Sequence, residues 1–321
     1  MIVAIDIGFG DTKVFTPRET FKFPSAIAPV QGLKDDFFSS ADIYEYQGRM
    51  FIVGEQALMY KNCFCTRSTE FVFRYAPILL YSALKKLSGI PREVVTGLPL
   101  STFLDRAKRD GFGKKMARLV VNGEVLTFDV SVFAEGHGIF VDYALDEKGE
   151  PVDRERIRET ALVIDIGFFT VDVLTITQGF PTREGSTTLE GDGISKICER
   201  LSDYIQKNYS FTLREQAVKD VLLERKLSIY GSEKDLSGII EEIVSEYVEW
   251  LLQEVQGRWD DFLKRADRLI IAGGGAYYVK EFLPEKYRGF VFIPESPEYS
   301  NARGFYKFLR AQKNEKAHSN P

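Results

Sequence analysis

The chain has 321 residues, which is enough for about two domains at roughly 150 residues each. Hydrophobic residues make up 44% of it and charged residues 28%, values that are typical of a globular protein and exclude a disordered or fibrous one. The formal net charge is -5, from 42 Lys and Arg against 47 Asp and Glu, so no strong general attraction to nucleic acid or to an anionic membrane is expected.

The counts of cysteine and histidine limit the chemistry further. Three cysteines cannot form a disulfide framework, which favours a reducing cytosol. His137 and His318 are too few for a histidine-rich metal site and for most Ser-His-Asp hydrolases. No apolar stretch reaches the ~18 residues of a membrane helix, and the segment after Met1 does not read as a signal peptide. We therefore expect a cytoplasmic protein that contacts neither membrane nor nucleic acid directly.

A strand and a hairpin open the chain. The apolar run from Ile2 to Ile7 is typical of a strand that is buried on both faces. The sequence Gly8-Phe-Gly10-Asp11 predicts a turn, after which a second strand runs from Thr12 to Phe15. Residues 21–71 are mixed in character and predict a small β-rich insertion.

Apolar spacing predicts the elements that follow. The expected strands are 93–99 and 268–272, and the expected helices are 75–87, 191–207, 237–256, 276–282 and 300–312. The last helix should pack back on the first part of the chain, and the polar residues 313–321 should form a disordered tail.

The opening strand and hairpin recur in the second half of the chain. Residues 161–174 repeat the pattern, with Asp165 in the place of Asp6, 159 residues later. Because solenoid repeats recur every ~20 to 50 residues, a repeat at half the chain length indicates two similar domains with a cleft between them. We expect the first domain over 1–160 and the second over 161–299.

Both hairpins have the features of an anion site. Asp6 and Asp165 each end a buried strand beside a glycine-containing turn, where backbone N–H groups can point at an anion. If the turns face each other, they clamp a phosphate chain from two sides. The carboxylates would hold hydrated Mg²⁺, and Lys13 would supply positive charge for the phosphates. A single aspartate of this kind is more often a turn residue, but two matched copies favour the binding interpretation.

A third glycine-rich turn follows the buried strand 268–272. Gly273-Gly-Gly275 would let a flat ring or a phosphate approach the backbone, and the N-terminus of the next helix favours an anion. An ordinary tight turn is the alternative. Two familiar nucleotide motifs are absent from the sequence: Gly113-Lys114 is followed by lysine rather than Ser or Thr, and Gly8-Phe-Gly10 lacks the third glycine of a dinucleotide fingerprint.

These motifs resemble those of the ATPase superfamily of actin, heat-shock chaperones and sugar kinases. Residues 6–13 resemble its first phosphate loop, residues 165–172 its second, and residues 273–276 its adenosine motif. The short length, the stretch 97–101 and the closing stretch 300–304 are most similar to bacterial and archaeal actin-like proteins of the ParM/StbA type. The resemblance implies an α/β, actin-like ATPase fold: two similar domains around a nucleotide cleft, with the small insertion in the first.

The resemblance also implies roles for individual residues. Asp165 and Glu135 would be catalytic, with Glu135 positioning the attacking water, although an exposed loop acid explains Glu135 equally well from the sequence alone. Asp6 and Asp165 would hold Mg²⁺ largely through water. Asp192 and Lys196 also fit an ordinary helix entry with a capping aspartate. The residues expected to bind the nucleotide are Gly8, Gly10, Thr12, Lys13, Gly167, Thr170, Asp192, Lys196, Gly273, Gly274 and Gly275.

The implied function is a filament that assembles and disassembles through binding and hydrolysis of ATP or GTP with Mg²⁺, in plasmid or DNA segregation or in cytoskeletal organisation. The expected partners are further copies of the chain and a DNA-binding adaptor protein. A small-molecule kinase or a regulatory ATPase of the same fold is the alternative. The chain departs from the family pattern at Phe168 and Phe169, which replace small or polar residues in the second loop.

Overall fold

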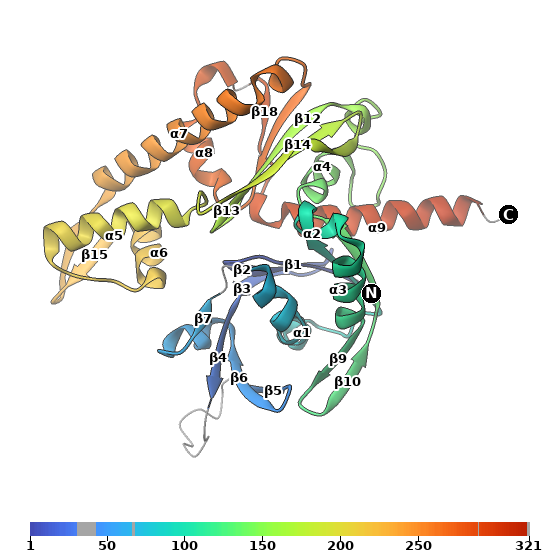
Figure 1. Cartoon of the computed structure of the whole chain (residues 1–321), viewed down its shortest axis with the longest axis horizontal. Coiled ribbons are helices and arrows are strands. Elements are labelled where there is room, and N and C mark those ends of the chain that lie inside the picture. The colour runs from blue at the N-terminus through green and yellow to red at the C-terminus, as the bar shows by residue number, and fades with distance from the viewer. Residues whose placement is uncertain (31–42, 66–67, 288, 320–321) are drawn as a thin grey trace.

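The computed structural model describes residues 1–30, 43–65, 68–287 and 289–319. Two five-stranded sheets, one above the other in Figure 1, form the two halves of the molecule. The first sheet has the order β11-β8-β1-β2-β3 and consists of β1 (Ile2–Ile7), β2 (Asp11–Phe15), β3 (Thr20–Pro24), β8 (Glu93–Leu98) and β11 (Asp129–Ala134). The second has the order β14-β13-β12-β17-β18 and consists of β12 (Ala161–Ile166), β13 (Thr170–Thr177), β14 (Phe180–Glu190), β17 (Arg268–Ala272) and β18 (Val291–Phe292).

The two sheets have the same topology. In each, the first strand pairs antiparallel with its hairpin partner on one side and parallel with a later strand on the other: β1 with β2 and β8, and β12 with β13 and β17. The repeat seen in the sequence is therefore a repeat of strand order, and the α/β fold predicted from it is confirmed.

Helices cover one face of each sheet with a large apolar core. On the first sheet the covering helices are α1 (Thr69–Lys86) and α3 (Arg106–Ala117), with α2 (Leu100–Leu104) beside them. On the second they are α5 (Ser195–Tyr209), α6 (Glu215–Glu224), α7 (Ser237–Leu263) and α8 (Ala276–Phe282). Strand residues alternate between the two faces, so Leu162 and Ile164 join this core while Ala161 and Val163 face the opposite side.

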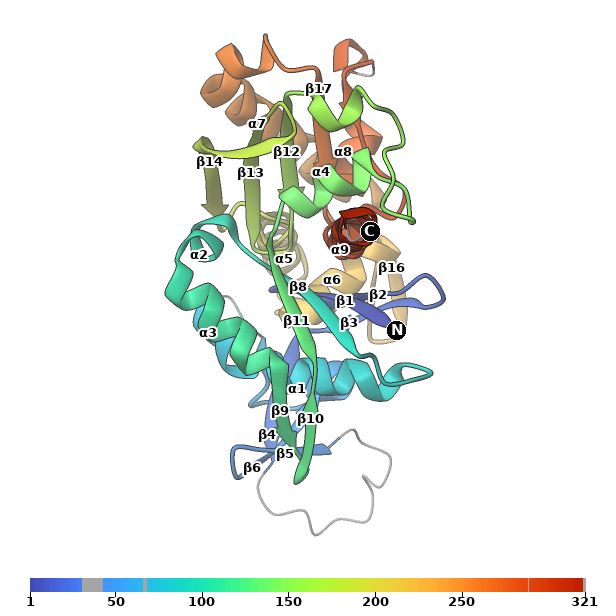
Figure 2. The ribbon, with the colours of Figure 1, turned by 90° about the vertical axis from the view of Figure 1, so that its right-hand side faces the viewer.

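The opposite faces of the two sheets each hold one helix, and these two helices cross. The first sheet packs on α9 (Ser300–Ser319), the last helix of the chain, and the second packs on α4 (His137–Ala144). Both lie between the two halves in Figure 2, where α9 is seen end-on. Gly138 and Gly304 make the crossing possible, because a Cβ on Gly304 would lie 1.7 Å from the carbonyl oxygen of Gly138.

A buried charge cluster fixes this crossing. Asp142 of α4, whose side chain is 2% exposed, lies 2.6 Å from Arg303 Nη2 and 2.7 Å from Lys307 Nζ, both on α9. Ser300 also donates to its carboxylate. Burial alone would raise the pKa of Asp142, but Arg303 and Lys307 outweigh that effect and hold the pKa below its ordinary value.

Smaller elements complete the chain. A separate four-stranded sheet contains β4 (Ala26–Val30), β5 (Ile43–Tyr46), β6 (Arg49–Val53) and β7 (Phe64–Cys65). Two-stranded ribbons are formed by β9 (Arg118–Val121) with β10 (Glu124–Thr127), and by β15 (Lys226–Ile229) with β16 (Ser232–Asp235). The short 3-10 helices are η2 (Gly54–Met59), η3 (Arg156–Arg158), η4 (Glu285–Tyr287) and η5 (Pro297–Tyr299).

Several predicted boundaries differ from the structure. The β-rich insertion expected over 21–71 includes β3, which instead extends the first sheet, and its residues 31–42 lie outside the described part. Helix α1 begins before residue 75 because the Ser68 side chain accepts a hydrogen bond from the backbone N–H of Phe71. The domain limits at 160 and 299 stay predictions.

The end of the chain also requires a correction. Residues 313–319 were expected to be disordered, but they continue α9, while 320 and 321 lie outside the described residues. Lys313 forms an ion pair with Glu93, and the Asn314 side chain donates to the carbonyl of Lys148, so both hold this last part of the helix against the body.

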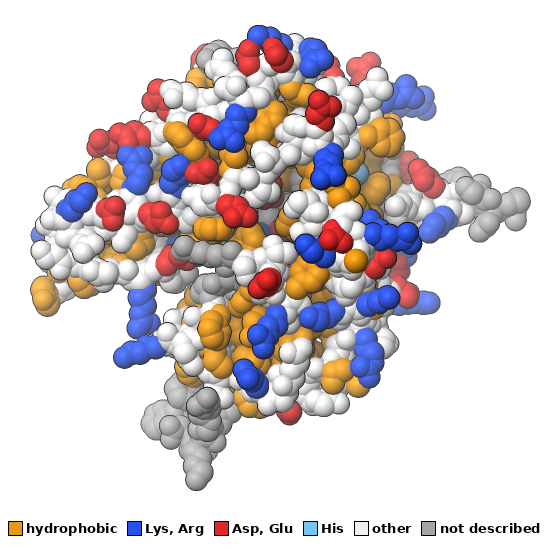
Figure 3. Space-filling model, in the orientation of Figure 1, with side chains coloured by type: hydrophobic (Ala, Val, Ile, Leu, Met, Phe, Trp, Pro, Cys, Tyr) orange, Lys and Arg blue, Asp and Glu red, His pale blue; other side chains and the backbone are white. Residues whose placement is uncertain are grey.

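The surface carries charges of both signs. On the face shown in Figure 3, acidic and basic side chains are interspersed over the upper half, and Lys and Arg are prominent over the lower half. Within the described residues, no helix combines the length and apolar character that a membrane span requires.

We predict that Asp142→Ala lowers the free energy of unfolding by about 3–5 kcal/mol, because it leaves Arg303 and Lys307 buried without their counter-charge. Urea unfolding of the variant and the wild type measures the loss. The exposed acid Glu147, changed to Ala, is the control and should leave the midpoint almost unchanged. A loss below about 1 kcal/mol would contradict the assignment of this cluster as the clamp between α4 and α9.

Candidate functional site

The two repeated hairpins have the same turn geometry. The backbone N–H of Gly8 donates to the carbonyl of Asp11 at 3.1 Å, and that of Gly167 donates to the carbonyl of Thr170 at 2.9 Å. Their strand registers differ in one respect: Asp6 lies opposite Lys13, whereas Asp165 lies opposite a second acid, Asp172. The backbone of the repeat is thus preserved while its charge is not.

A cavity of about 350 Å³ is lined by both hairpins and by other residues from both halves of the chain. This volume lies in the range of small-ligand sites. Its wall brings together most of the residues that the sequence analysis selected: Asp6, Gly8, Gly10, Lys13, Glu135, Asp165, Gly167, Thr170, Gly273 and Gly274.

Carboxylates surround a lysine in this cavity. Lys13 Nζ lies 3.2 Å from Asp6 Oδ2. Burial lowers the pKa of Lys13, but the charges of Asp6, Asp11 and Asp165 outweigh it, so the pKa lies above its ordinary value. Lys13 therefore stays charged.

Three other acids of the cavity have raised pKa values, so they ionise less readily than a carboxyl group in water. Burial and the charges of Asp172 and Asp6 raise the pKa of Asp165 to about 7. Burial, followed by the charges of Asp6, Asp172 and Asp165, raises the pKa of Glu135 well above its ordinary value. The pKa of Asp172 is raised too, mainly by burial, although hydrogen bonds from Thr188 and Thr170 lower it. Burial is the largest cause of all three shifts, and the negative charge of neighbouring carboxylates adds to it.

This donor set fits a magnesium ion that keeps part of its water shell. Within the described ranges, no group of three or more His, Cys, Asp or Glu side chains is arranged to hold a metal ion. Magnesium sites at phosphates need only one or two carboxylates, with water and phosphate oxygens completing the octahedron. Asp6 and Asp165 match that requirement, and a cation beside them would lower the raised pKa values of Asp165 and Glu135.

The three glycines of the third turn have different environments. Gly273 has a φ of +82°, and a Cβ there would lie 2.3 Å from Asp165 Oδ1. A Cβ on Gly275 would lie 2.1 Å from the Ile166 side chain, and Gly275 is not part of the cavity wall. Gly274 lines the cavity, and a Cβ on it would meet nothing within 4 Å. Packing thus requires glycine at 273 and 275, while position 274 is left open toward the cavity.

Three other predicted binding residues lie outside the cavity wall. Thr12 is fully buried, and its hydroxyl is 2.9 Å from that of Ser25. Asp192 and Lys196 pair with each other at 2.7 Å, and Lys196 lies over the ring of Trp250 on α7.

The segment before α5 explains why Asp192 and Lys196 do not line the cavity. The backbone N–H groups of Gly191 and Gly193 donate to the carbonyl of Phe169, and that of Ser195 donates to Phe168. These donors hold the second hairpin, so the helix begins at Ser195 and not at the predicted residue 191.

Sequence reasoning did not select Asn301, which joins the two halves at the site. Its Nδ2 donates to Asp165 Oδ2 at 2.7 Å, and its Oδ1 accepts from the backbone N–H of Gly136 at 2.9 Å. Asn301 therefore orients Asp165 and fixes the backbone next to Glu135. The closing stretch 300–304 already carried this asparagine as part of a family resemblance, and that was the available signal.

One end of the cavity is less charged. Its wall there consists of side chains from α6, α8 and the start of α5, together with the backbone of the third turn: Ile194, Gln216, Lys219, Leu222, Leu223, Gly274 and Tyr278. Apolar side chains with a few polar groups suit a flat heterocycle, so the cavity combines a charged end with an apolar one.

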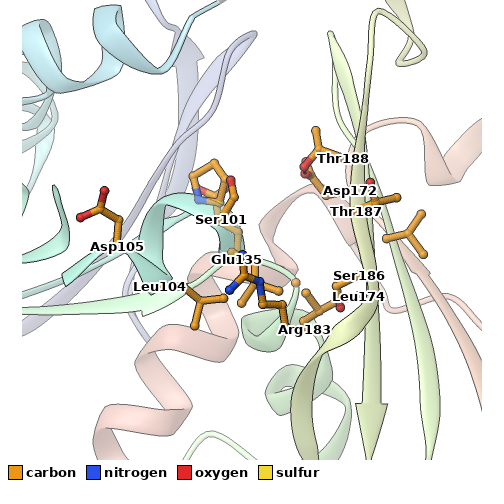
Figure 4. A pocket seen from close by; sticks show the side chains of 14 residues that line it. Ser101, Leu104, Asp105, Glu135, Asp172, Leu174, Arg183, Ser186, Thr187 and Thr188 are labelled. Carbon is orange, nitrogen blue, oxygen red and sulfur yellow. Dashed lines mark hydrogen bonds between the residues drawn. The ribbon is translucent and has the colours of Figure 1, made fainter. Parts of the chain in front are cut away.

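A second cavity of about 570 Å³ lies on the other side of Glu135 and shares Pro99, Glu135 and Asp172 with the first. Figure 4 shows it between α2 and the β13–β14 hairpin, with Arg183 reaching from β14 toward Glu135. Glu135 is therefore a half-buried acid between two cavities. The alternative that it is an exposed loop acid is excluded.

Family models match both halves of the chain. Residues 4–138 match the model described as the N-terminal domain of actin-like proteins, and residues 163–285 match the C-terminal model of archaeal MreB-like actin homologues. A curated relative, the archaeal actin homolog of Thermoplasma acidophilum, is 26% identical over 326 residues, which cover 95% of this chain and 97% of the relative.

Solved structures share the fold across the whole chain. The crystal structure of Ta0583, an archaeal actin homolog, has a TM-score of 0.78 at 22% identity and covers 98% of this chain and 99% of its own. Its complex with ADP has a TM-score of 0.76 at 21% identity, with coverage of 96% and 99%. A 15-stranded ParM filament from Clostridium botulinum has a TM-score of 0.73 at 22% identity, with coverage of 96% and 98%.

We predict that Asp165→Asn stabilises the ligand-free protein in a pH-dependent way. The folded state raises the pKa of this carboxyl from 3.8 to about 7, so the wild type loses stability as the pH rises through that interval. The advantage of the amide over the wild type should therefore grow between about pH 4 and pH 7 and then level off. Thermal unfolding in a chelating buffer measures it.

Asp261, whose side chain is 96% exposed, provides the control as Asp261→Asn, which should show no such trend. A stability difference between Asp165→Asn and wild type that is constant across this pH range would show that Asp165 does not carry the excess charge.

Proposed function

We propose that this chain, which belongs to the prokaryotic actin-like ATPases of the ParM type, binds ATP or GTP with Mg²⁺ between its two hairpins, hydrolyses it, and assembles into filaments under control of that hydrolysis. The observation that carries the proposal is the pair of matched glycine turns that line one cavity, beside carboxylates in excess of Lys13. Such a site favours a ligand that brings both phosphate oxygens and a divalent cation.

The residues of the two hairpins would hold the phosphates. Backbone N–H groups in turns of this kind make anion sites, and Lys13, kept charged by its acidic neighbours, would pair with phosphate oxygens. Asp6 and Asp165 would hold the magnesium ion, in part through water. Bound magnesium would neutralise charge on the phosphates. The apolar end with Leu222 and Tyr278 would take the base.

Asp165 and Glu135 would act on the attacking water. Phosphoryl transfer depends mainly on positioning and on charge stabilisation. Asn301 fixes one oxygen of Asp165, and the backbone N–H of Glu135 donates to the carbonyl of Leu98 at 2.9 Å. Once a cation lowers their raised pKa values, both side chains are ionised and can accept hydrogen bonds from a water.

The assembly part of the proposal is supported by the ADP complex of Ta0583 and by the ParM filament, which have the same fold. A head-to-tail contact that does not close into a ring gives an open filament. We place this filament in plasmid or DNA segregation or in cytoskeletal organisation, with a DNA-binding adaptor protein as its partner.

A small-molecule kinase is the second candidate, and one observation favours it. The cavity of about 570 Å³ next to Glu135 is large enough for a small acceptor with a hydroxyl group. Transfer of the terminal phosphate to an added sugar or acid, with the protein monomeric throughout, would establish the kinase in place of the filament.

We predict that Gly274→Val abolishes nucleotide binding and leaves the protein folded. A Cβ at 274 meets no protein atom within 4 Å but enters the cavity, so its methyl groups would occupy ligand space. Calorimetric titration with ATP and Mg²⁺ measures the affinity, and circular dichroism checks the fold. Gly238→Ala, at an equally open position on α7 outside the cavity wall, is the control. Unchanged affinity in Gly274→Val would remove this turn from the binding site.

We predict that Glu135→Ala hydrolyses ATP about 10² to 10⁴-fold more slowly and forms longer-lived filaments. If the triphosphate state assembles more tightly than the diphosphate state, slow hydrolysis retains the tighter state. Phosphate release, pelleting and electron microscopy with Mg²⁺ measure both effects. Wild-type protein that stays monomeric at tens of micromolar with ATP or a slowly hydrolysed analogue would refute the filament, and undiminished turnover in the variant would refute the role of Glu135.

A further inference from the structure

The two phosphate hairpins touch each other through aromatic side chains. Phe9, at the tip of the β1–β2 hairpin, meets Phe169, at the tip of the β12–β13 hairpin, with ring centroids 6.3 Å apart and ring planes at 86°. This edge-to-face geometry is a favoured arrangement for aromatic pairs. Beside it, Gly10 lies against Phe168, so closely that a Cβ on Gly10 would be 2.9 Å from the Phe168 Cβ. The contact therefore runs between the two halves of the molecule.

Each hairpin tip is anchored in its own half. Phe9 packs against the core of the first sheet, and Phe168 packs against the core of the second. Lys219 of α6 holds its Nζ 3.6 Å from the centre of the Phe168 ring, a cation–π contact within the second half. Because both tips are fixed to their own bodies, moving the halves apart must separate Phe9 from Phe169.

The sequence at this point departs from what phosphate binding requires. Backbone N–H groups and small residues suffice for a phosphate turn, and two adjacent phenylalanines in the second turn add apolar surface beside a charged cavity. Phe168 itself lines that cavity and narrows it next to Gly10. The aromatic residues thus serve the contact between the hairpins rather than the phosphates.

We propose that Phe9 and Phe169 form an aromatic clasp that holds the two phosphate hairpins together and slows release of the bound nucleotide. This inference rests on the proposed nucleotide site and concerns the rate at which that site opens. A ligand lying between the hairpins leaves only after the clasp has parted, so the strength of the ring contact enters the barrier to release. A contact of this kind is worth roughly a two- to tenfold change in rate.

A double-mutant cycle tests the clasp. Phe9→Ser, Phe169→Ser and the double variant are loaded with a fluorescent ADP analogue and Mg²⁺, and release is followed by stopped-flow with excess unlabelled ADP. We expect each single variant to release the analogue about two to tenfold faster than wild type, and the double variant to release it no faster than the singles, because the same contact is lost in all three. Phe180→Ser, at a side chain that is 75% exposed, is the control and should match wild type.

Two further measurements keep the test decisive. Phe169→Tyr retains the ring and should restore slow release, which a mere loss of folding would not allow. In the ligand-free protein, hydrogen exchange of the backbone amides in residues 8–11 and 167–170 should increase in the serine variants, again without additivity.

The outcomes separate the two proposals. If the analogue fails to bind wild type while exchange at the hairpins rises non-additively, the nucleotide site is refuted and the contact between the hairpins stands. If binding is normal and the effects of the two substitutions on release multiply, or release is unchanged, the clasp is refuted and the nucleotide site stands.

Discussion

An excess of carboxylates where the two hairpins meet is the constraint on which the site depends. The duplicated strands place Asp6 opposite Lys13 in one half but Asp165 opposite Asp172 in the other, so the repeat brings acids together that a single lysine cannot neutralise. Burial, followed by these like charges, raises the pKa values of Asp165 and Glu135. Folding without a ligand is therefore opposed by charge repulsion at this point, and a cation that enters the cavity removes that opposition.

The crossing of α4 and α9 fixes where the acids of one half lie relative to those of the other. Helix α4 lies early in the chain but packs on the second sheet, and α9 ends the chain but packs on the first. Their contact at Gly138 and Gly304 brings Asn301 to both Asp165 and the backbone beside Glu135. The buried cluster around Asp142 joins the same two helices. A relative movement of the halves would therefore change the positions of Asp165 and Glu135 relative to each other.

Local sequence patterns predicted the hairpins, but they did not predict the contacts that form where α4 and α9 cross. Periodicity and the duplicated Asp-x-Gly turns identified the first strand and the hairpin of each half and part of the cavity wall, because each signal lies within a few neighbouring residues. Asn301 reaches Asp165 only through α9, and no local pattern gives that distance. Asp192 and Lys196 lie outside the cavity wall for a related reason: backbone donors around them are used by the second hairpin, and their side chains pair with each other beside α7.

Two opposing effects act on the distance between the hairpins. The edge-to-face contact of Phe9 with Phe169 draws them together, while the like charges of Asp6, Asp165 and Asp172 push them apart. A bound cation cancels the repulsion and leaves the attraction, so the halves should be held most firmly when nucleotide and magnesium are present. The crossing of α4 and α9 connects the two sheets, so a change in the distance between the hairpins would act on both halves. A ligand acts on assembly only through such a difference between states, and here the difference originates in the charge on a few carboxylates.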